Sequence, residues 1–183
     1  MNKGFVSRAG EKLEFALNSF NVDLTEKVAA DFGCSTGGFV DVLLRRGAKK
    51  VYAVDVAYGE LNYTLRMDGR VVVLERTNAM YVDLPELMDF ISIDVGWTKQ
   101  EKIVPNALKN MKERGSLISL IKPFYELGRS GKLLTEEETK ELIVKLIAYY
   151  KSLDGVSYEG LIDSPIKGER GKNKEFLVFL KKG

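Results

Sequence analysis

The sequence contains no histidine, and this absence excludes more functions than any other feature of its composition. Ser-His-Asp and Cys-His catalysis, histidine-ligated metals and a histidine general base all require an imidazole group. The single cysteine, Cys34, excludes internal disulfides and cysteine-clustered zinc, and it favours a reducing compartment. Acid–base chemistry must therefore come from Asp, Glu, Lys, Tyr or Cys34, and we expect no metal site.

Long apolar segments and chain-dividing features are also lacking. No apolar run approaches the ~20 residues of a membrane span, and the N-terminus has no hydrophobic signal region. Repeats and low-complexity tracts are absent, and the four prolines form no linker. We therefore expect a cytoplasmic protein with no membrane partner and a single domain over residues 1–183. The net charge of +2 neither requires nor excludes a nucleic-acid partner, and the oligomeric state stays open.

Short apolar strands alternate with helices along most of the chain. Strands are predicted at 28–32, 51–55, 71–75, 90–94, 117–121, 156–162 and 176–180. Helices are predicted at 7–20, 38–46, 60–67 and 100–113, and from Thr135, where Glu138 completes a capping box. This alternation predicts an α/β fold, a mostly parallel seven-stranded sheet with helices on both faces. Because no helical pattern separates the last two strands, the final strand should run antiparallel.

The turn after the first predicted strand is rich in glycine. It contains Asp31, Gly33, Cys34, Ser35, Thr36, Gly37, Gly38 and Phe39, and it joins a strand to a helix. Ser35 stands where a dinucleotide site needs its middle glycine, which disfavours an NAD(P) oxidoreductase. Asp55 ends the second strand, where an acid can accept both ribose hydroxyls of a bound nucleoside.

This glycine loop, taken with Asp55, resembles the S-adenosylmethionine pocket of Rossmann-like class I methyltransferases. The alternative is a tight strand–helix turn that needs glycine for backbone reasons alone. We assign cofactor binding to the loop residues above together with Asp55, Val56, Asn78 and Asp94. Asn78 either contacts the adenine edge or lies in a surface loop. Cys34 is expected to pack, because no histidine can activate its thiol.

Ionisable residues also stand at the ends of three predicted strands. Asp94 ends the fourth strand, Lys122 follows the fifth, and Glu175 precedes the final strand. An antiparallel final strand starts at the edge where the parallel strands end, which is where such sheets bind ligands. These three residues indicate lysine–carboxylate chemistry. Lys12 borders the apolar stripe of the first helix, and by itself it is more typical of a surface lysine.

Longer segments resemble the TlyA-type (haemolysin A-like) ribosomal RNA methyltransferases of the wider FtsJ/RrmJ-like group. The matching segments are 7–13, 31–41, 51–59, 72–78, 121–126, 164–165 and 173–177. The Lys-Asp-Lys-Glu tetrad of that family falls on Lys12, Asp94, Lys122 and Glu175. The resemblance implies S-adenosylmethionine as the cofactor, ribosomal RNA or a ribosomal subunit as the partner, and methylation of a ribose 2′-hydroxyl.

The chain departs from that family at three points. No segment of this sequence resembles the small S4 RNA-binding domain that usually precedes this region in the family, and Cys34 replaces an alanine. Residues 95–99 read Val-Gly-Trp-Thr-Lys, where the family tends to have Leu-Ser-Phe-Ile-Ser. Because residues 95–99 should contact the substrate, the resemblance does not define the target nucleotide.

The expected mechanism is in-line methyl transfer, in which most of the rate enhancement comes from positioning the methyl donor and the acceptor hydroxyl. Lys122, in its neutral form, is the candidate base, with Asp94 orienting it and Lys12 and Glu175 positioning the ribose. The balance of burial and charge that sets the pKa of Lys122 is left open by the sequence.

RNA binding is assigned to a basic surface and to exposed aromatic rings. The basic residues are those of segment 167–174 with Arg8, Lys12 and Lys99, and Trp97 or Tyr125 would stack a base. Two other functions remain as alternatives: a small-molecule O-methyltransferase, and a non-catalytic RNA- or cofactor-binding module. Membrane lysis has no support from a spanning segment or a basic amphipathic helix.

Overall fold

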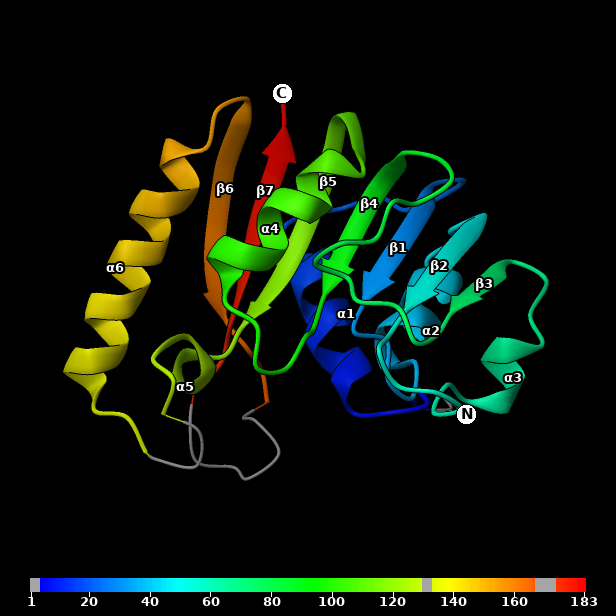
Figure 1. The fold of residues 1–183 in the computed structure, drawn as a ribbon, viewed down its shortest axis with the longest axis horizontal. Helices are drawn as coiled ribbons and strands as arrows, with labels where there is room; N and C mark the ends of the chain where they lie inside the picture. The colour runs from blue at the N-terminus through cyan, green and yellow to red at the C-terminus, as the bar shows by residue number, and fades with distance from the viewer. Residues whose placement is uncertain (1–3, 130–132, 167–173) are drawn as a thin grey trace.

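The computed structural model describes residues 4–129, 133–166 and 174–183, which form a seven-stranded sheet with helices on both faces (Figure 1). The strands are β1 (Val28–Phe32), β2 (Lys50–Val54), β3 (Val71–Leu74), β4 (Met88–Ile93), β5 (Met111–Ile121), β6 (Val156–Asp163) and β7 (Phe176–Lys182). The helices are α1 (Ala9–Ser19), α2 (Gly38–Arg45), α3 (Tyr63–Arg66), α4 (Gln100–Lys109), α5 (Pro123–Glu126) and α6 (Glu136–Ser152).

The strand order is β3-β2-β1-β4-β5-β7-β6, and the directions agree with the sequence-based prediction. Strands β1 to β5 pair in parallel, whereas β7 runs antiparallel to both β5 and β6. Ile121 at the end of β5 is paired with Phe176 at the start of β7. The carboxyl ends of the parallel strands and the start of β7 therefore share one edge of the sheet, here named the carboxyl edge.

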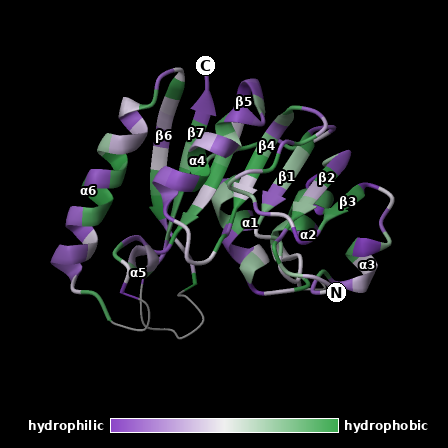
Figure 2. Cartoon of the chain, in the orientation of Figure 1, coloured by the Kyte–Doolittle hydropathy of each residue, from purple (hydrophilic) through white to green (hydrophobic). Residues whose placement is uncertain are grey.

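Apolar side chains form a separate core on each face of the sheet. Helices α1, α2 and α3 cover one face, where Leu17 and Leu43 are fully buried. Helices α4 and α6 cover the other face, with Ile103 and Leu146 in its core. Figure 2 shows apolar residues along the central strands and polar residues spread over the helices. All five residues of β1 are buried, as expected for a strand that is covered on both faces of the sheet.

The helix predicted at 60–67 is only the single turn α3. The Asn62 side chain accepts a hydrogen bond of 2.9 Å from the Thr64 amide and caps the helix there. The cap starts the helix three residues later than the apolar pattern suggested.

The helix predicted at 100–113 ends at Lys109, and β5 begins at Met111 instead of at residue 117. Met111 is fully buried and pairs with Met88 of β4, so sheet pairing overrides the helical pattern at this point. Helix α5 was not predicted, although Pro123 at its first position is a typical helix start.

Helix α6 begins with the capping box predicted from the sequence. The Thr135 side chain accepts from the Glu138 amide, and the Glu138 side chain accepts from the Thr135 amide. The box satisfies two amides that would otherwise lack partners at the helix start. None of the helices in the described residues is long and apolar enough to cross a membrane.

Candidate active site

The glycine loop between β1 and α2 brings backbone against the carboxyl edge. Gly33 has a φ of +88°, and a Cβ there would lie 2.6 Å from the backbone oxygen of Asp94, which follows β4. Gly37 has a φ of +96°, and a Cβ there would overlap the Leu65 side chain. Both positions need glycine for conformation and for space. The loop therefore lies directly beside the segment that carries Asp94.

Asp31, in β1, is a buried carboxylate with only one oxygen in a hydrogen bond. Ser92 Oγ donates to Asp31 Oδ1 at 2.8 Å, and Oδ2 has no hydrogen-bond partner within the described part of the chain. Burial raises the pKa of Asp31 to about 8; the hydrogen bond from Ser92 opposes this shift, and the charges of Asp94 and Asp55 add to it. A buried oxygen without a partner suits a cationic ligand group.

Asp55 follows β2, and its carboxylate is oriented by two backbone amides. Ser35 N–H donates to Oδ2 and Ala57 N–H donates to Oδ1, each at 2.8 Å. Each oxygen keeps a second lone pair, so the carboxylate can still accept from ligand hydroxyls. Val56 and Asn78, the other predicted contacts on this side, are exposed.

The loop residues divide into buried and exposed groups. Ser35 and Thr36 are exposed, whereas Cys34 and Phe39 are buried in the core beneath α1 and α2. Burial raises the pKa of the Cys34 thiol, and the charges of Asp31 and Asp55 act in the same direction. The raised pKa keeps the thiol protonated, and a protonated thiol packed in the core is a poor nucleophile. Cys34 and Phe39 can face a ligand only through their backbone.

Two lysine–carboxylate ion pairs lie at the carboxyl edge. Lys122 Nζ, directly after β5, is 2.5 Å from Asp94 Oδ1, directly after β4; their side chains are 17% and 16% exposed. Lys12 Nζ on α1 is 2.5 Å from Glu175 Oε2, directly before β7; their side chains are 9% and 2% exposed. The predicted residues are thus paired two by two, and Lys12 is buried rather than solvated.

The two ion pairs influence one another through Lys122. Burial acts to lower the pKa of Lys122, but the charges of Asp94 and Glu175 raise it above its ordinary value. Attraction to the carboxylates therefore outweighs burial, and Lys122 is an ammonium group at neutral pH. The structure answers the question that the sequence left open, in favour of the charged form.

Two aromatic rings lie beside Lys122. The Trp97 ring is 4.7 Å from the Tyr125 ring between centroids, and Lys122 Nζ lies 5.9 Å from the Tyr125 centroid. Trp97 is 75% exposed and has a φ of +61°, a left-handed conformation that is costly for a bulky residue. Such strain is frequently found at functional sites, and exposed ring faces stack nucleobases.

A buried polar cluster behind the site was missed by the sequence analysis. Glu126 Oε1 accepts from the Gln100 amide at 2.9 Å, and Tyr150 Oη donates to Gln100 Oε1 at 3.0 Å. Glu126 ends the segment 121–126, which carried part of the family resemblance, and that was its only signal. Ser92 was also missed, although a serine inside the apolar strand 90–94 is a visible exception to its pattern.

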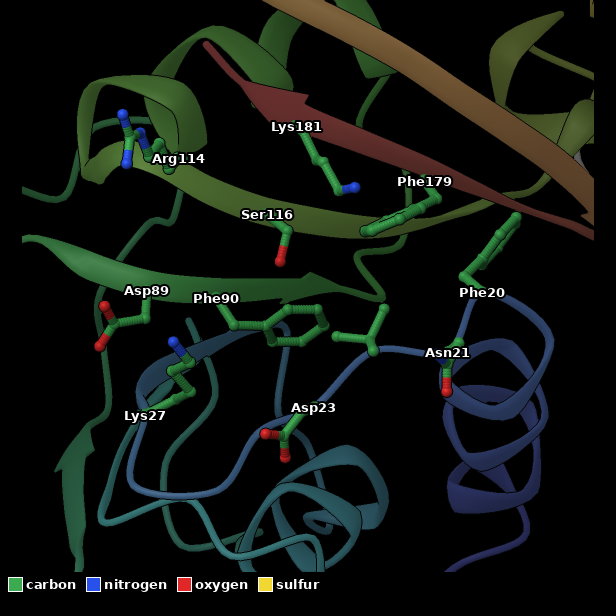
Figure 3. Close-up of a pocket in the computed structure, with 11 residues that line it drawn as sticks. Phe20, Asn21, Asp23, Lys27, Asp89, Phe90, Arg114, Ser116, Phe179 and Lys181 are labelled. Carbon is green, nitrogen blue, oxygen red and sulfur yellow. The ribbon is translucent and has the colours of Figure 1, made fainter.

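A separate pocket of about 210 Å³ opens at the opposite edge of the sheet (Figure 3). It is lined by side chains of both charges, among them Lys27, Asp89 and Lys181. Asp89 pairs with Lys112 at 2.9 Å and Lys181 with Glu159 at 3.4 Å, so neighbouring residues already neutralise part of its charge. None of the predicted site residues lines it.

The predicted RNA-binding residues are only partly described. Of the basic segment 167–174, residues 167–173 lie outside the described residues, and Lys174 is exposed. Arg8 and Lys99 are exposed as well. These three cations are therefore free to meet an anionic partner.

Comparison with known proteins places most of the chain in a family. Residues 5–182 match the FtsJ-like methyltransferases. The chain is 40% identical to Bacillus subtilis YqxC over an alignment of 185 residues, which covers 96% of this chain and 65% of YqxC, less than two thirds of that protein. It is 34% identical over 187 residues to the Mycobacterium tuberculosis 16S/23S rRNA (cytidine-2'-O)-methyltransferase TlyA, covering 98% of this chain and 69% of TlyA. A crystal structure from Lactococcus lactis superposes with a TM-score of 0.91 at 39% identity, covering 98% of this chain and 89% of that one.

Proposed function

The chain belongs to the FtsJ-like methyltransferase family, and from this premise we propose that it methylates a ribose 2′-hydroxyl of ribosomal RNA with S-adenosylmethionine. The observation that carries the proposal is the arrangement of two lysine–carboxylate ion pairs, Lys122 with Asp94 and Lys12 with Glu175. They stand beside the glycine loop, where neither Asp31 nor Asp55 has a lysine partner among the described residues. Such an edge suits transfer from a cationic donor to a neutral hydroxyl.

The glycine-loop residues fit S-adenosylmethionine, a nucleoside that carries a sulfonium and an ammonium group. Asp31 Oδ2 is a buried acceptor without a partner among the described residues, and it would receive the ammonium group. Gly33 has no side chain to fill the space beside Asp94, and Asp55 has free lone pairs for the ribose hydroxyls. When bound, S-adenosylmethionine supplies an electrophilic methyl group.

The lysine–carboxylate residues would act on the acceptor hydroxyl. Neutral Lys122 would take the hydroxyl proton onto Nζ, while Asp94 orients that amine and Lys12 and Glu175 hold the ribose. Because Asp94 and Glu175 raise the pKa of Lys122, its neutral fraction is small at neutral pH. Methyl transfer should therefore accelerate steadily as the pH rises above 7.

RNA as the substrate class rests on chemistry at the rim of the site. Trp97 and Tyr125 offer ring faces to an unpaired base, and Arg8 and Lys99 offer cations to phosphates. The rRNA named for the TlyA relative favours ribosomal RNA among RNA substrates. Binding that depends on phosphate contacts should weaken steeply with rising salt.

The test incubates the protein with methyl-labelled S-adenosylmethionine and unmodified ribosomal subunits, then digests the RNA to nucleosides. The proposal expects label in 2′-O-methylated nucleosides. Label confined to bases, or to small metabolites with none in RNA, would contradict it, and the second result would favour a small-molecule O-methyltransferase. Absence of transfer to any acceptor, with the labelled donor still bound, would favour a non-catalytic binding module.

A further inference from the structure

Helix α4 begins without a cap from its own side chains. Its N-cap residue, Lys99, makes no side-chain hydrogen bond to the helix. The hydroxyl of Thr98 donates to the Gly96 carbonyl instead, at 3.3 Å. The first amide of the helix, Gln100 N–H, donates to Glu126 Oε1, 26 positions further along the chain. A carboxylate at this position also interacts favourably with the helix dipole, so Glu126 caps α4 from another element.

This hydrogen bond joins the two segments that follow Asp94 and Lys122. Residues 95–99 lead from Asp94 to the start of α4, and α5 follows Lys122 directly. The amides of Tyr125 and Glu126 donate to the Lys122 carbonyl, at 2.9 and 3.3 Å. The loop 95–99 is therefore fixed at one end by β4 and at the other by a carboxylate attached to the turn of Lys122.

The cap is supported from behind by other buried groups. Gln100 donates through Nε2 to the Leu120 carbonyl of β5 at 3.3 Å and accepts from Tyr150 of α6 at 3.0 Å. Gln100 and Tyr150 are almost completely buried. A satisfied buried network of this kind has little freedom to rearrange, so it defines where Glu126 meets the helix.

We propose that Glu126 is a positioning residue for methyl transfer, which holds the loop after Asp94 against the turn of Lys122. Through this cap, Asp94 keeps its contact with Lys122 Nζ and the Trp97 ring stays against the Tyr125 ring. Among the described residues no hydrogen bond joins the Glu126 side chain to either ion pair, so this side chain acts only through the two segments that it joins. The inference rests on the proposed function for its effect on turnover, whereas the cap itself can be tested without RNA.

The cap should respond to pH. Burial raises the pKa of Glu126 to about 7. The charge of Glu101 also raises this pKa, whereas the hydrogen bond from the Gln100 amide and the charge of Lys99 lower it. The charged and titratable groups that face it are Lys99 and Glu101 at the start of α4 and Tyr150 on α6. Below pH 7 the carboxylate gains a proton and becomes a weaker acceptor for the helix amide. The loop 95–99 should loosen as the pH falls through this value.

Two readouts of the full-length protein test the proposal, with Glu126→Gln as the main variant. Gln keeps an acceptor oxygen but cannot ionise, and Glu126→Ala removes the acceptor. Because Trp97 is the sole tryptophan, its fluorescence reports directly on the loop 95–99 without any substrate. Glu138→Gln is the matched control, since Glu138 also accepts a backbone amide at a helix start, that of α6.

We expect the wild-type Trp97 emission to change with a midpoint near pH 7, and that of Glu126→Gln to show no such change. At pH 8, turnover should fall about threefold in Glu126→Gln and about tenfold in Glu126→Ala, with KM for RNA unchanged. The break near pH 7 in the turnover profile should disappear in Glu126→Gln and persist in Glu138→Gln.

A Trp97 emission that does not change with pH in the wild type would overturn the proposal. A Glu126→Gln protein would also overturn it if its Trp97 emission still changed near pH 7, or if its turnover profile still had a break near pH 7. These results are separate from the proposed function. If no RNA is methylated but the fluorescence transition depends on Glu126, the cap stands and the 2′-O-methylation proposal fails. If RNA is methylated normally by Glu126→Gln at every pH, the positioning role fails and the proposed function stands.

Discussion

The two halves of the carboxyl edge hold their carboxylates in opposite ways. In the glycine-loop half, neither Asp31 nor Asp55 forms an ion pair with any described residue; a serine hydroxyl bonds the first and backbone amides bond the second. In the half formed by β4, β5 and β7, Asp94 and Glu175 each lie 2.5 Å from a lysine. At one edge of the sheet, the acidic side chains of the first half thus have no cationic partner among the described residues, whereas those of the second half are each paired with a lysine.

This difference between the two halves matches the charge of the ligand group that each half is proposed to bind. A buried carboxylate without a cation has a raised pKa, as Asp31 has, and its ionised form becomes favourable only when a cationic ligand arrives. A carboxylate already paired with lysine attracts no further cation and instead fixes an amine for a neutral hydroxyl. We expect substitutions in the first half to alter cofactor binding and substitutions in the second half to alter transfer.

The largest effect should come from Lys122→Ala. Loss of the proposed base should slow single-turnover methyl transfer by about 10²–10⁴-fold, with cofactor affinity unchanged. Lys112→Ala is the matched control, because Lys112 of β5 pairs with Asp89 of β4 at 2.9 Å near the opposite edge of the same two strands. A Lys122→Ala protein that transfers the methyl group at the wild-type rate would contradict the assignment of methyl transfer to the lysine-paired half.

The next largest effect should be on stability, from breaking the more buried ion pair. Lys12→Met leaves the buried Glu175 carboxylate without its lysine partner, which should lower the free energy of unfolding by about 3–5 kcal/mol. Denaturant titration measures this loss. The comparison is Lys50→Met at the exposed Lys50–Glu86 pair, which should cost far less. Equal losses at both pairs would show that burial of the Lys12 pair has no energetic consequence.

Cofactor affinity should depend on the ionisation of Asp31. Its pKa is raised to about 8, so the unliganded group is mostly protonated at pH 7 and must lose its proton to receive a cation. Affinity should therefore rise about tenfold per pH unit up to pH 8, and calorimetry in two buffers at pH 7 should detect proton release. Asp31→Asn should abolish both effects, and Asp41→Asn, at a buried acid on α2, should change neither. Proton uptake when the cofactor binds would contradict this prediction, which requires proton release.

The smallest effect should come from Cys34→Ala. The thiol packs in the core and its raised pKa keeps it protonated, so its removal should cost only about 1 kcal/mol of stability. Methyl-transfer rates at saturating cofactor should not change. A large loss of transfer with normal cofactor binding would give Cys34 a chemical role that its burial argues against.

The sequence was most informative where a local pattern has one structural solution. The strand ends at Asp94 and Lys122, the capping box at Thr135 and the antiparallel last strand follow from periodicity and chain direction. The predicted α/β fold of a class I methyltransferase is confirmed. The strand that begins at Met111 could not be predicted, because its pairing with Met88 is a tertiary contact that outweighs the local helical pattern.

The sequence predicted where the candidate site residues lie but not how they pair. The strand ends placed Asp94, Lys122 and Glu175 at one edge, while the burial of Lys12 against Glu175 depends on how α1 packs on the sheet. The raised pKa of Lys122 and the cap of α4 by Glu126 depend on distances between segments far apart in the chain. Such distances leave no mark on local sequence.

The most direct test compares Asp31→Asn and Lys122→Ala in one single-turnover experiment, with RNA bound and S-adenosylmethionine varied up to saturation. The division of the carboxyl edge predicts that Asp31→Asn needs more cofactor but reaches nearly the wild-type rate at saturation. It predicts that Lys122→Ala binds cofactor normally and stays slow at every concentration. Equal losses of the saturated rate in both variants, or a fast Lys122→Ala protein, would contradict the account.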